Sequence, residues 1–86
     1  MNTFVFFLGW YKGWCTDSYG ADQKSGQISL GKKTSTEECL TECRKKDEAT
    51  GCEFLPQSNC WVHTKDVYTG AWDKDDSDYL CFVFPG

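Results

Sequence analysis

Six cysteines are the residues with the clearest chemistry in this 86-residue sequence. Two of them, Cys39 and Cys43, lie four positions apart in the stretch TSTEECLTECRKK, residues 34–46. On a helix, side chains at i and i+4 lie on one face, about 6 Å apart. Thiols at this spacing can form disulfides with partners facing the helix, or supply two ligands to a metal ion. The remaining cysteines are Cys15, Cys52, Cys60 and Cys81.

The number and spacing of the cysteines favour disulfides over a metal site. An even number of cysteines in so short a chain is typical of secreted domains stapled by disulfides. Structural zinc sites usually combine two close pairs of ligands. Here only Cys39 and Cys43 are close together, and His63 is the single histidine. We therefore expect a secreted, extracellular protein with no metal and no cofactor.

Other groups of residues give little support for catalysis. One histidine would have to serve as the base for any nucleophile, and no glycine-rich phosphate loop is present. The acidic run WDKDDSD, residues 72–78, lacks the glycine and glutamate that a calcium-binding loop requires. The net charge of −4 argues against nucleic acid as a partner. No apolar run approaches the roughly 20 residues of a membrane helix, so we expect no membrane insertion. Because catalytic residues are lacking, we also expect a non-enzymatic protein.

Local patterns predict the elements that position the cysteines. Thr34 or Ser35 is a candidate N-cap, and Glu38 lies three residues after Ser35, as in a capping box. A short helix should therefore follow and carry Cys39 and Cys43 on its buried face. Strands are predicted at GQISLG, residues 26–31, and at YLCFVF, residues 79–84.

The segment GCEFLPQSNCWVHT, residues 51–64, predicts a hairpin with its turn at residues 56–59. Cys52 and Cys60 lie symmetrically about Pro56, and neighbouring strands lie about 4.8 Å apart, so this hairpin offers two partners to the helix. A cross-strand bridge between Cys52 and Cys60 competes with such helix-to-strand bridges, and sequence alone does not choose between them. Strand alternation places Cys52, Phe54, Cys60, Val62 and Thr64 on one face, and Glu53, Trp61, His63 and Lys65 on the other.

These cysteine-bearing segments resemble a PAN/apple module. The similar segments are Cys15 near the start, TEECLTEC at 36–43, ATGCEF at 49–54, NCWVHT at 59–64 and the terminal YLCFVF. The resemblance implies a small disulfide-rich α+β domain over residues 15–86, in which a curved antiparallel sheet cradles one helix. It also implies a non-enzymatic extracellular module that binds proteins or carbohydrates, as in adhesion. The implied bridges are Cys15–Cys81, Cys39–Cys60 and Cys43–Cys52.

Residues 1–14 depart from that family's pattern, because they are longer and more apolar than the expected lead-in. We expect either a central or doubly covered strand of the domain's own sheet, or an arm that pairs with a neighbouring subunit. A remnant of a targeting sequence is a third interpretation. The arm would make the protein a structural subunit of an extracellular assembly or filament that self-associates as a homo-oligomer. Its candidate assembly residues are Phe4, Val5, Phe6, Phe7 and Leu8.

Aromatic side chains supply the candidate ligand-binding residues. Four tryptophans is a high number for this length, and indoles stack on sugar rings and anchor protein interfaces. Trp61 should face outward because its neighbours Cys60 and Val62 point inward. His63 shares that face and is expected at the surface. The predicted contact set for a glycan or an extracellular protein is Trp61, His63, Tyr68 and Trp72.

Overall fold

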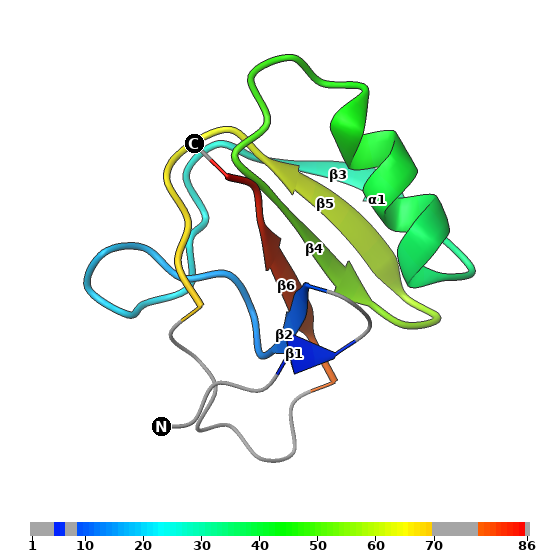
Figure 1. The fold of residues 1–86 in the computed structure, drawn as a ribbon, viewed down its shortest axis with the longest axis horizontal. Coiled ribbons are helices and arrows are strands. Elements are labelled where there is room, and N and C mark those ends of the chain that lie inside the picture. Colours follow the sequence, from blue (N-terminus) through cyan, green and yellow to red (C-terminus); the bar gives the residue numbers. More distant parts are fainter. Residues whose placement is uncertain (1–4, 7–8, 70–77, 86) are drawn as a thin grey trace.

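One antiparallel sheet and one helix make up the computed structural model over its described residues, 5–6, 9–69 and 78–85 (Figure 1). Helix α1 (Thr36–Arg44) lies between the third and fourth strands in the sequence. The sheet order is β1-β2-β6-β4-β5-β3. The prediction of a small, disulfide-rich α+β domain is confirmed. The strands are β1 (Val5–Phe6), β2 (Trp10–Lys12), β3 (Gln27–Gly31), β4 (Gly51–Leu55), β5 (Asn59–His63) and β6 (Leu80–Val83).

Helix α1 begins where the capping pattern predicts. Ser35 is the N-cap, and its hydroxyl accepts a hydrogen bond of 3.1 Å from the Glu38 N–H. The Glu38 carboxylate in turn accepts hydrogen bonds from the Thr34 N–H, at 2.7 Å, and from the Thr34 hydroxyl, at 2.9 Å. These two bonds lower the pKa of Glu38 below its ordinary value of 4.5. The start of α1 is thus fixed by side chains from both sides of the cap.

The turn of the β4–β5 hairpin is one residue shorter than predicted. Asn59 pairs with Leu55, so only residues 56–58 form the turn. The Ser58 N–H donates to the Leu55 carbonyl at 3.0 Å, and Gln57 adopts a φ of 64° to close the loop. The predicted hairpin is therefore present, with its turn centred on Gln57 and with Asn59 in β5 instead of in the turn.

In this register, Cys52 and Cys60 do not lie directly opposite each other. Cys52 lies opposite Val62, and Cys60 lies opposite Phe54. All four side chains belong to the core beneath α1, so the predicted alternation of the two strands is confirmed. Each cysteine faces the helix, and the cross-strand bridge does not form.

Three disulfides connect the elements, and they are the pairs that the family resemblance implies. Two of them join successive turns of α1 to the neighbouring strands β5 and β4. The third joins the segment after β2 to strand β6, on the opposite face of the sheet. Three bridges in so small a domain are typical of an oxidising environment. The bridges are Cys15–Cys81, Cys39–Cys60 and Cys43–Cys52.

The main core lies between α1 and the sheet, and a smaller cluster lies on the opposite face. Burying these apolar side chains supplies the hydrophobic stabilisation that the disulfides supplement. The core consists of the buried residues Trp10, Cys39, Cys43, Cys52, Phe54, Cys60, Val62 and Leu80. The smaller cluster consists of Cys15, Val67 and Cys81.

Strands β1 and β2 come from the apolar lead-in, residues 1–14. Strand β2 pairs with β6, and among the described residues β1 pairs with β2 alone, at the edge of the sheet. The prediction of a central strand is therefore wrong, because β2 occupies the place beside β6 and leaves β1 outside it. Phe4, Phe7 and Leu8 lie outside the described residues. Within the described residues, no helix has the length and apolar character needed to span a membrane.

Candidate functional site

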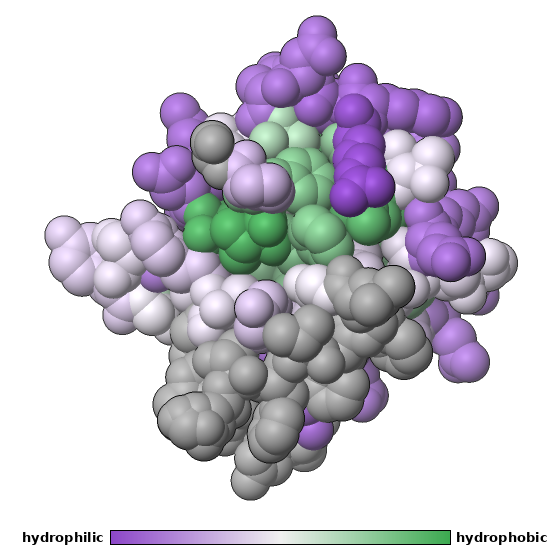
Figure 2. All heavy atoms as spheres, viewed as in Figure 1, coloured by the Kyte–Doolittle hydropathy of each residue, from purple (hydrophilic) through white to green (hydrophobic). Residues whose placement is uncertain are grey.

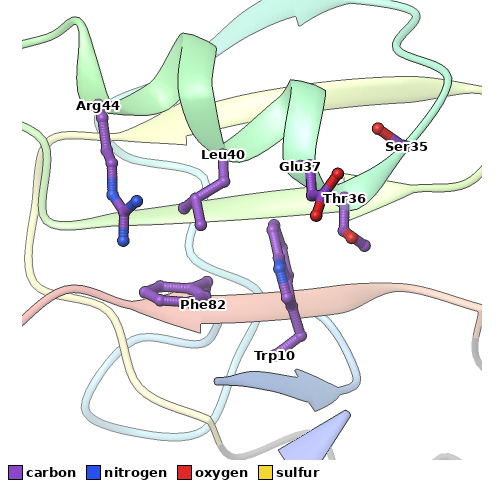
Figure 3. A pocket seen from close by; sticks show the side chains of 7 residues that line it. All are labelled: Trp10, Ser35, Thr36, Glu37, Leu40, Arg44 and Phe82. Atoms are coloured by element: carbon purple, nitrogen blue, oxygen red, sulfur yellow. The ribbon is translucent and has the colours of Figure 1, made fainter. Parts of the chain in front are cut away.

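A groove of about 650 Å³ lies between α1 and strands β2 and β6, on the helix face of the sheet (Figure 3). Its volume falls in the range of pockets that hold small ligands or parts of larger ones. Hydrophobic residues gather at the centre of the face shown in Figure 2, with hydrophilic residues above them and to the sides. The groove is lined by Trp10, Ser35, Thr36, Glu37, Leu40, Arg44 and Phe82.

Aromatic and aliphatic side chains form the floor of this groove. Trp10 is only 2% exposed, and its ring lies edge-to-face with Phe82 at a centroid distance of 5.4 Å. Leu40 and Phe82 are half-buried and present the accessible apolar surface. Gly9 precedes Trp10 with a φ of 115°, and a Cβ there would lie 2.7 Å from the Phe82 ring. Glycine is thus required for β2 to place Trp10 beside Phe82.

Opposite charges stand at the two ends of the floor. Glu37 and Arg44 are both exposed, on turns of α1 that lie about 10 Å apart along the helix axis. Leu40 lies between them and points into the groove (Figure 3). The guanidinium of Arg44 lies over the Phe82 ring, with Cζ 5.8 Å from the centroid. This arrangement can bind a ligand that has an apolar body and a charged group at each end.

Of the residues that the sequence analysis proposed for ligand binding, the three that the structure describes do not line the groove. Trp61 lies on the other face of the sheet, where it is half-buried and stacks on Tyr79 with ring centroids 5.9 Å apart. Tyr68 is 46% exposed, and it lies in the segment after β5. Trp72 lies outside the described residues. Their role in binding stays a prediction.

His63 is a buried residue, and the prediction that it lies at the surface is wrong. Its side chain is 0% exposed, and its Nε2 lies 2.9 Å from Oε1 of Glu53, which is itself buried. The same carboxylate oxygen accepts a hydrogen bond of 3.2 Å from the Cys15 N–H. The segment around Cys15 is tied to β6 by its disulfide and covers this face of the sheet. Strand alternation predicted the face of His63 correctly but not the segment that covers it.

Tyr79 borders this buried polar pair. Burial raises the pKa of its phenol, and the negative charges of Glu53 and Asp22 raise it further. The Tyr79 ring also lies edge-to-face with Trp14, with centroids 6.0 Å apart. This face of the sheet is therefore packed with polar and aromatic groups that contact one another, whereas the helix face leaves its groove open.

Sequence reasoning missed the groove, although one signal for it was present. Glu37, Leu40 and Arg44 recur at i, i+3 and i+7, a spacing that places them on one face of a helix. That face lies beside the one that carries Cys39 and Cys43. The contributions of Trp10 and Phe82 depend on the pairing of β2 with β6, which local patterns do not reveal.

Comparisons with known proteins add no relative. No family model, no curated protein and no solved structure matches the chain. The PAN/apple resemblance therefore remains a prediction based on the quoted segments. The fold class rests on the structure of the chain itself.

Proposed function

We propose that the protein is an extracellular, non-enzymatic binding module whose groove between α1 and β6 takes a short extended segment of a protein partner. The observation that carries this proposal is the groove itself, an apolar floor with Glu37 at one end and Arg44 at the other. Such a combination of apolar anchor and polar rim is typical of protein-recognition sites.

The spacing of the two charges indicates the kind of segment that fits. A chain in the extended polyproline II conformation rises about 3.1 Å per residue and turns once every three residues, so side chains at i and i+3 lie on one face, about 9 Å apart. This matches the two turns of helix that separate Glu37 from Arg44. The expected partner segment carries an acidic residue at one position, a basic residue three positions away, and apolar residues between them. The acidic residue contacts Arg44, and the apolar residues pack on Leu40 and Phe82.

The burial of the three tryptophans that the structure describes favours a protein partner over a carbohydrate. Sugar rings stack on open indole faces, but Trp10 is buried, and Trp14 and Trp61 are half-buried and in contact with Tyr79. The groove instead offers Leu40 and the edge of Phe82, which suit an aliphatic or aromatic side chain of a peptide. The three disulfides support an extracellular setting for such recognition.

Selection from a peptide library tests this proposal. A display library of random decapeptides is selected on the oxidised protein, and we expect enrichment of the acidic–apolar–apolar–basic pattern. Affinity of an enriched peptide is then measured by calorimetry for the protein and for Arg44→Glu. Replacing an attractive pair by a repulsive one should weaken binding about tenfold, equivalent to about 1.4 kcal/mol.

Lys45→Glu is the matched control, because it makes the same charge change one position further along. Lys45 does not line the groove, and it pairs with Glu42 at 2.9 Å. Equal weakening by Arg44→Glu and Lys45→Glu would show that only net charge matters, and the groove would be the wrong site. Signal on a glycan array, with no enriched peptide, would instead move the proposal to a carbohydrate ligand.

Self-association through the lead-in is a second candidate function, and the position of β1 favours it. Strand β1 lies at the edge of the sheet, where a strand from a second copy can add to it by main-chain hydrogen bonds. In this case we expect light scattering to report an oligomer that becomes a monomer when residues 2–9 are deleted. A monomer both before and after the deletion would exclude this function.

A further inference from the structure

Four of the six cysteine sulfurs gather in a single buried cluster beneath α1. Cys39 and Cys43 enter it from the helix, Cys52 from β4 and Cys60 from β5. All four residues are 0% exposed, and their sulfur atoms all lie within 4.8 Å of one another. Sulfurs that belong to different bridges also touch, since those of Cys39 and Cys52 are 3.4 Å apart.

This spacing is close to that of a tetrahedral zinc site. Zinc binds thiolates at about 2.3 Å, which sets the distance between neighbouring sulfurs of a tetrahedron at about 3.8 Å. No two of the four sulfurs are more than 4.8 Å apart. The bonded pairs, now 2.12 and 2.09 Å apart, would separate to about 3.8 Å once their bridges are reduced. Two ligands come from one turn of helix and two from adjacent strands below it, so the two pairs of sulfurs face each other. The sequence analysis set a zinc site aside because Cys52 and Cys60 do not form a second close pair along the chain.

We propose that, when the two bridges Cys39–Cys60 and Cys43–Cys52 are reduced, their four sulfurs form a Cys₄ site for Zn²⁺. Each bridge takes two electrons and two protons from a reductant such as a dithiol, which is oxidised to its own disulfide. The zinc ion then displaces the four protons of the resulting thiols. One ion thereby holds α1 to β4 and β5 in place of the two bridges.

The site would let the same fold exist in two redox states. In the oxidised chain, two covalent bridges connect the helix to the hairpin. In the reduced chain, zinc would make the same two connections through the same residues, and metal binding would then contribute directly to folding. The third bridge, Cys15–Cys81, belongs to the separate cluster on the other face and takes no part.

Cobalt substitution in the full 86-residue chain tests the proposal. The chain is reduced without oxygen by a water-soluble phosphine, which becomes the phosphine oxide by taking the oxygen of a water molecule. Co²⁺ is then titrated. We expect the visible and charge-transfer absorption of a tetrahedral cobalt–thiolate site, complete at one ion per chain and abolished by one equivalent of Zn²⁺. The oxidised chain should give no such absorption.

Two double variants locate the site. Cys15→Ser/Cys81→Ser keeps the four clustered sulfurs and should reproduce the full absorption, whereas Cys39→Ser/Cys60→Ser should lose it. Hydrogen exchange should show that Zn²⁺ restores protection to β4 and β5 amides of the reduced chain, which a site formed in an unfolded chain would not do. The proposal is overturned if the reduced chain shows no charge-transfer band, if Cys39→Ser/Cys60→Ser keeps it, or if the amides stay unprotected.

Discussion

The two faces of the sheet, each with a small core, are stabilised in different ways. On the helix face, two short-range bridges hold α1 above the strands and leave a groove beside it. On the opposite face, one long-range bridge and the buried pair of Glu53 and His63 hold the segment around Cys15 flat against the sheet. The covered face supports the fold, and the open face keeps the groove in which we propose that a partner binds.

The two faces also differ in how much the substitution of a charged residue should destabilise the fold. Glu37 and Arg44 are exposed, so the groove can change its specificity with little effect on folding. Glu53 and His63 are buried, with Oε1 of Glu53 in contact with Nε2 of His63, and removing either side chain leaves a buried polar atom of the other without this partner. We therefore expect substitutions on the two faces to separate into effects on stability and effects on binding.

The disulfides should produce the largest effect, and their contributions should differ between the faces. Removing Cys15–Cys81, which closes a separation of 66 residues, should cost about 4 kcal/mol of unfolding free energy. Removing Cys43–Cys52, with a separation of 9 residues, should cost about 2.5 kcal/mol. The measurement is urea unfolding of the two double alanine variants. Each variant removes two buried sulfurs, so the packing loss is matched, and equal costs would contradict the role of loop length.

The buried polar pair should give the next largest effect. Glu53→Ala leaves His63 Nε2 and the Cys15 N–H without the oxygen that both contact, so we expect a loss of about 3 kcal/mol. Urea unfolding measures it. The control is Glu42→Ala, which breaks the exposed pair with Lys45 and should cost less than about 1 kcal/mol. Similar costs for the two variants would show that the Glu53–His63 pair is accessible to water in solution.

The N-cap of α1 should have a smaller effect, on the helix face. Ser35→Ala removes the acceptor for the Glu38 N–H and should cost about 1 kcal/mol. Ser35→Asp is the matched variant, because its carboxylate can accept the same hydrogen bond and should keep most of the stability. If both variants unfold at the urea concentration of the parent, the bridges alone hold the helix in place.

The fold could be predicted from the sequence where local chemistry determines it. The N-cap Ser35 and the alternation of Cys52, Phe54, Cys60 and Val62 were readable because capping and pleating act over a few residues. The turn of the hairpin was predicted one residue too long, because Gln57 closes it with a positive φ, which glutamine rarely adopts.

The candidate site was harder to predict because it depends on contacts between distant segments. Trp10 and Phe82 meet only through the pairing of β2 with β6, and His63 is buried only because the segment around Cys15 lies over it. An outward-facing position on a strand predicts a direction, not whether another part of the chain covers it.

The cap also predicts a dependence on pH. The hydrogen bonds from Thr34 lower the pKa of Glu38 in the folded chain, so its contribution to stability is complete above the ordinary pKa of 4.5. That contribution is lost as the pH falls through the lower folded-state pKa. Unfolding free energy measured against pH should therefore decrease on acidification, and Glu38→Gln should show a smaller decrease. An identical pH profile for the two proteins would show that the Thr34–Glu38 contacts do not persist in solution.

The smallest expected effect on stability is also the one that separates the two faces most sharply. Arg44→Gln keeps a polar side chain of similar length at an exposed position and should change the unfolding free energy by less than about 0.5 kcal/mol. Because Arg44 forms one end of the groove, the same substitution should still weaken binding of a selected peptide several-fold. Unfolding in urea and calorimetry on the same variant measure both quantities. A loss of stability as large as that of Glu53→Ala would mean that Arg44 holds α1 on the sheet through its contact with Phe82, and the helix face would then be structural like the other.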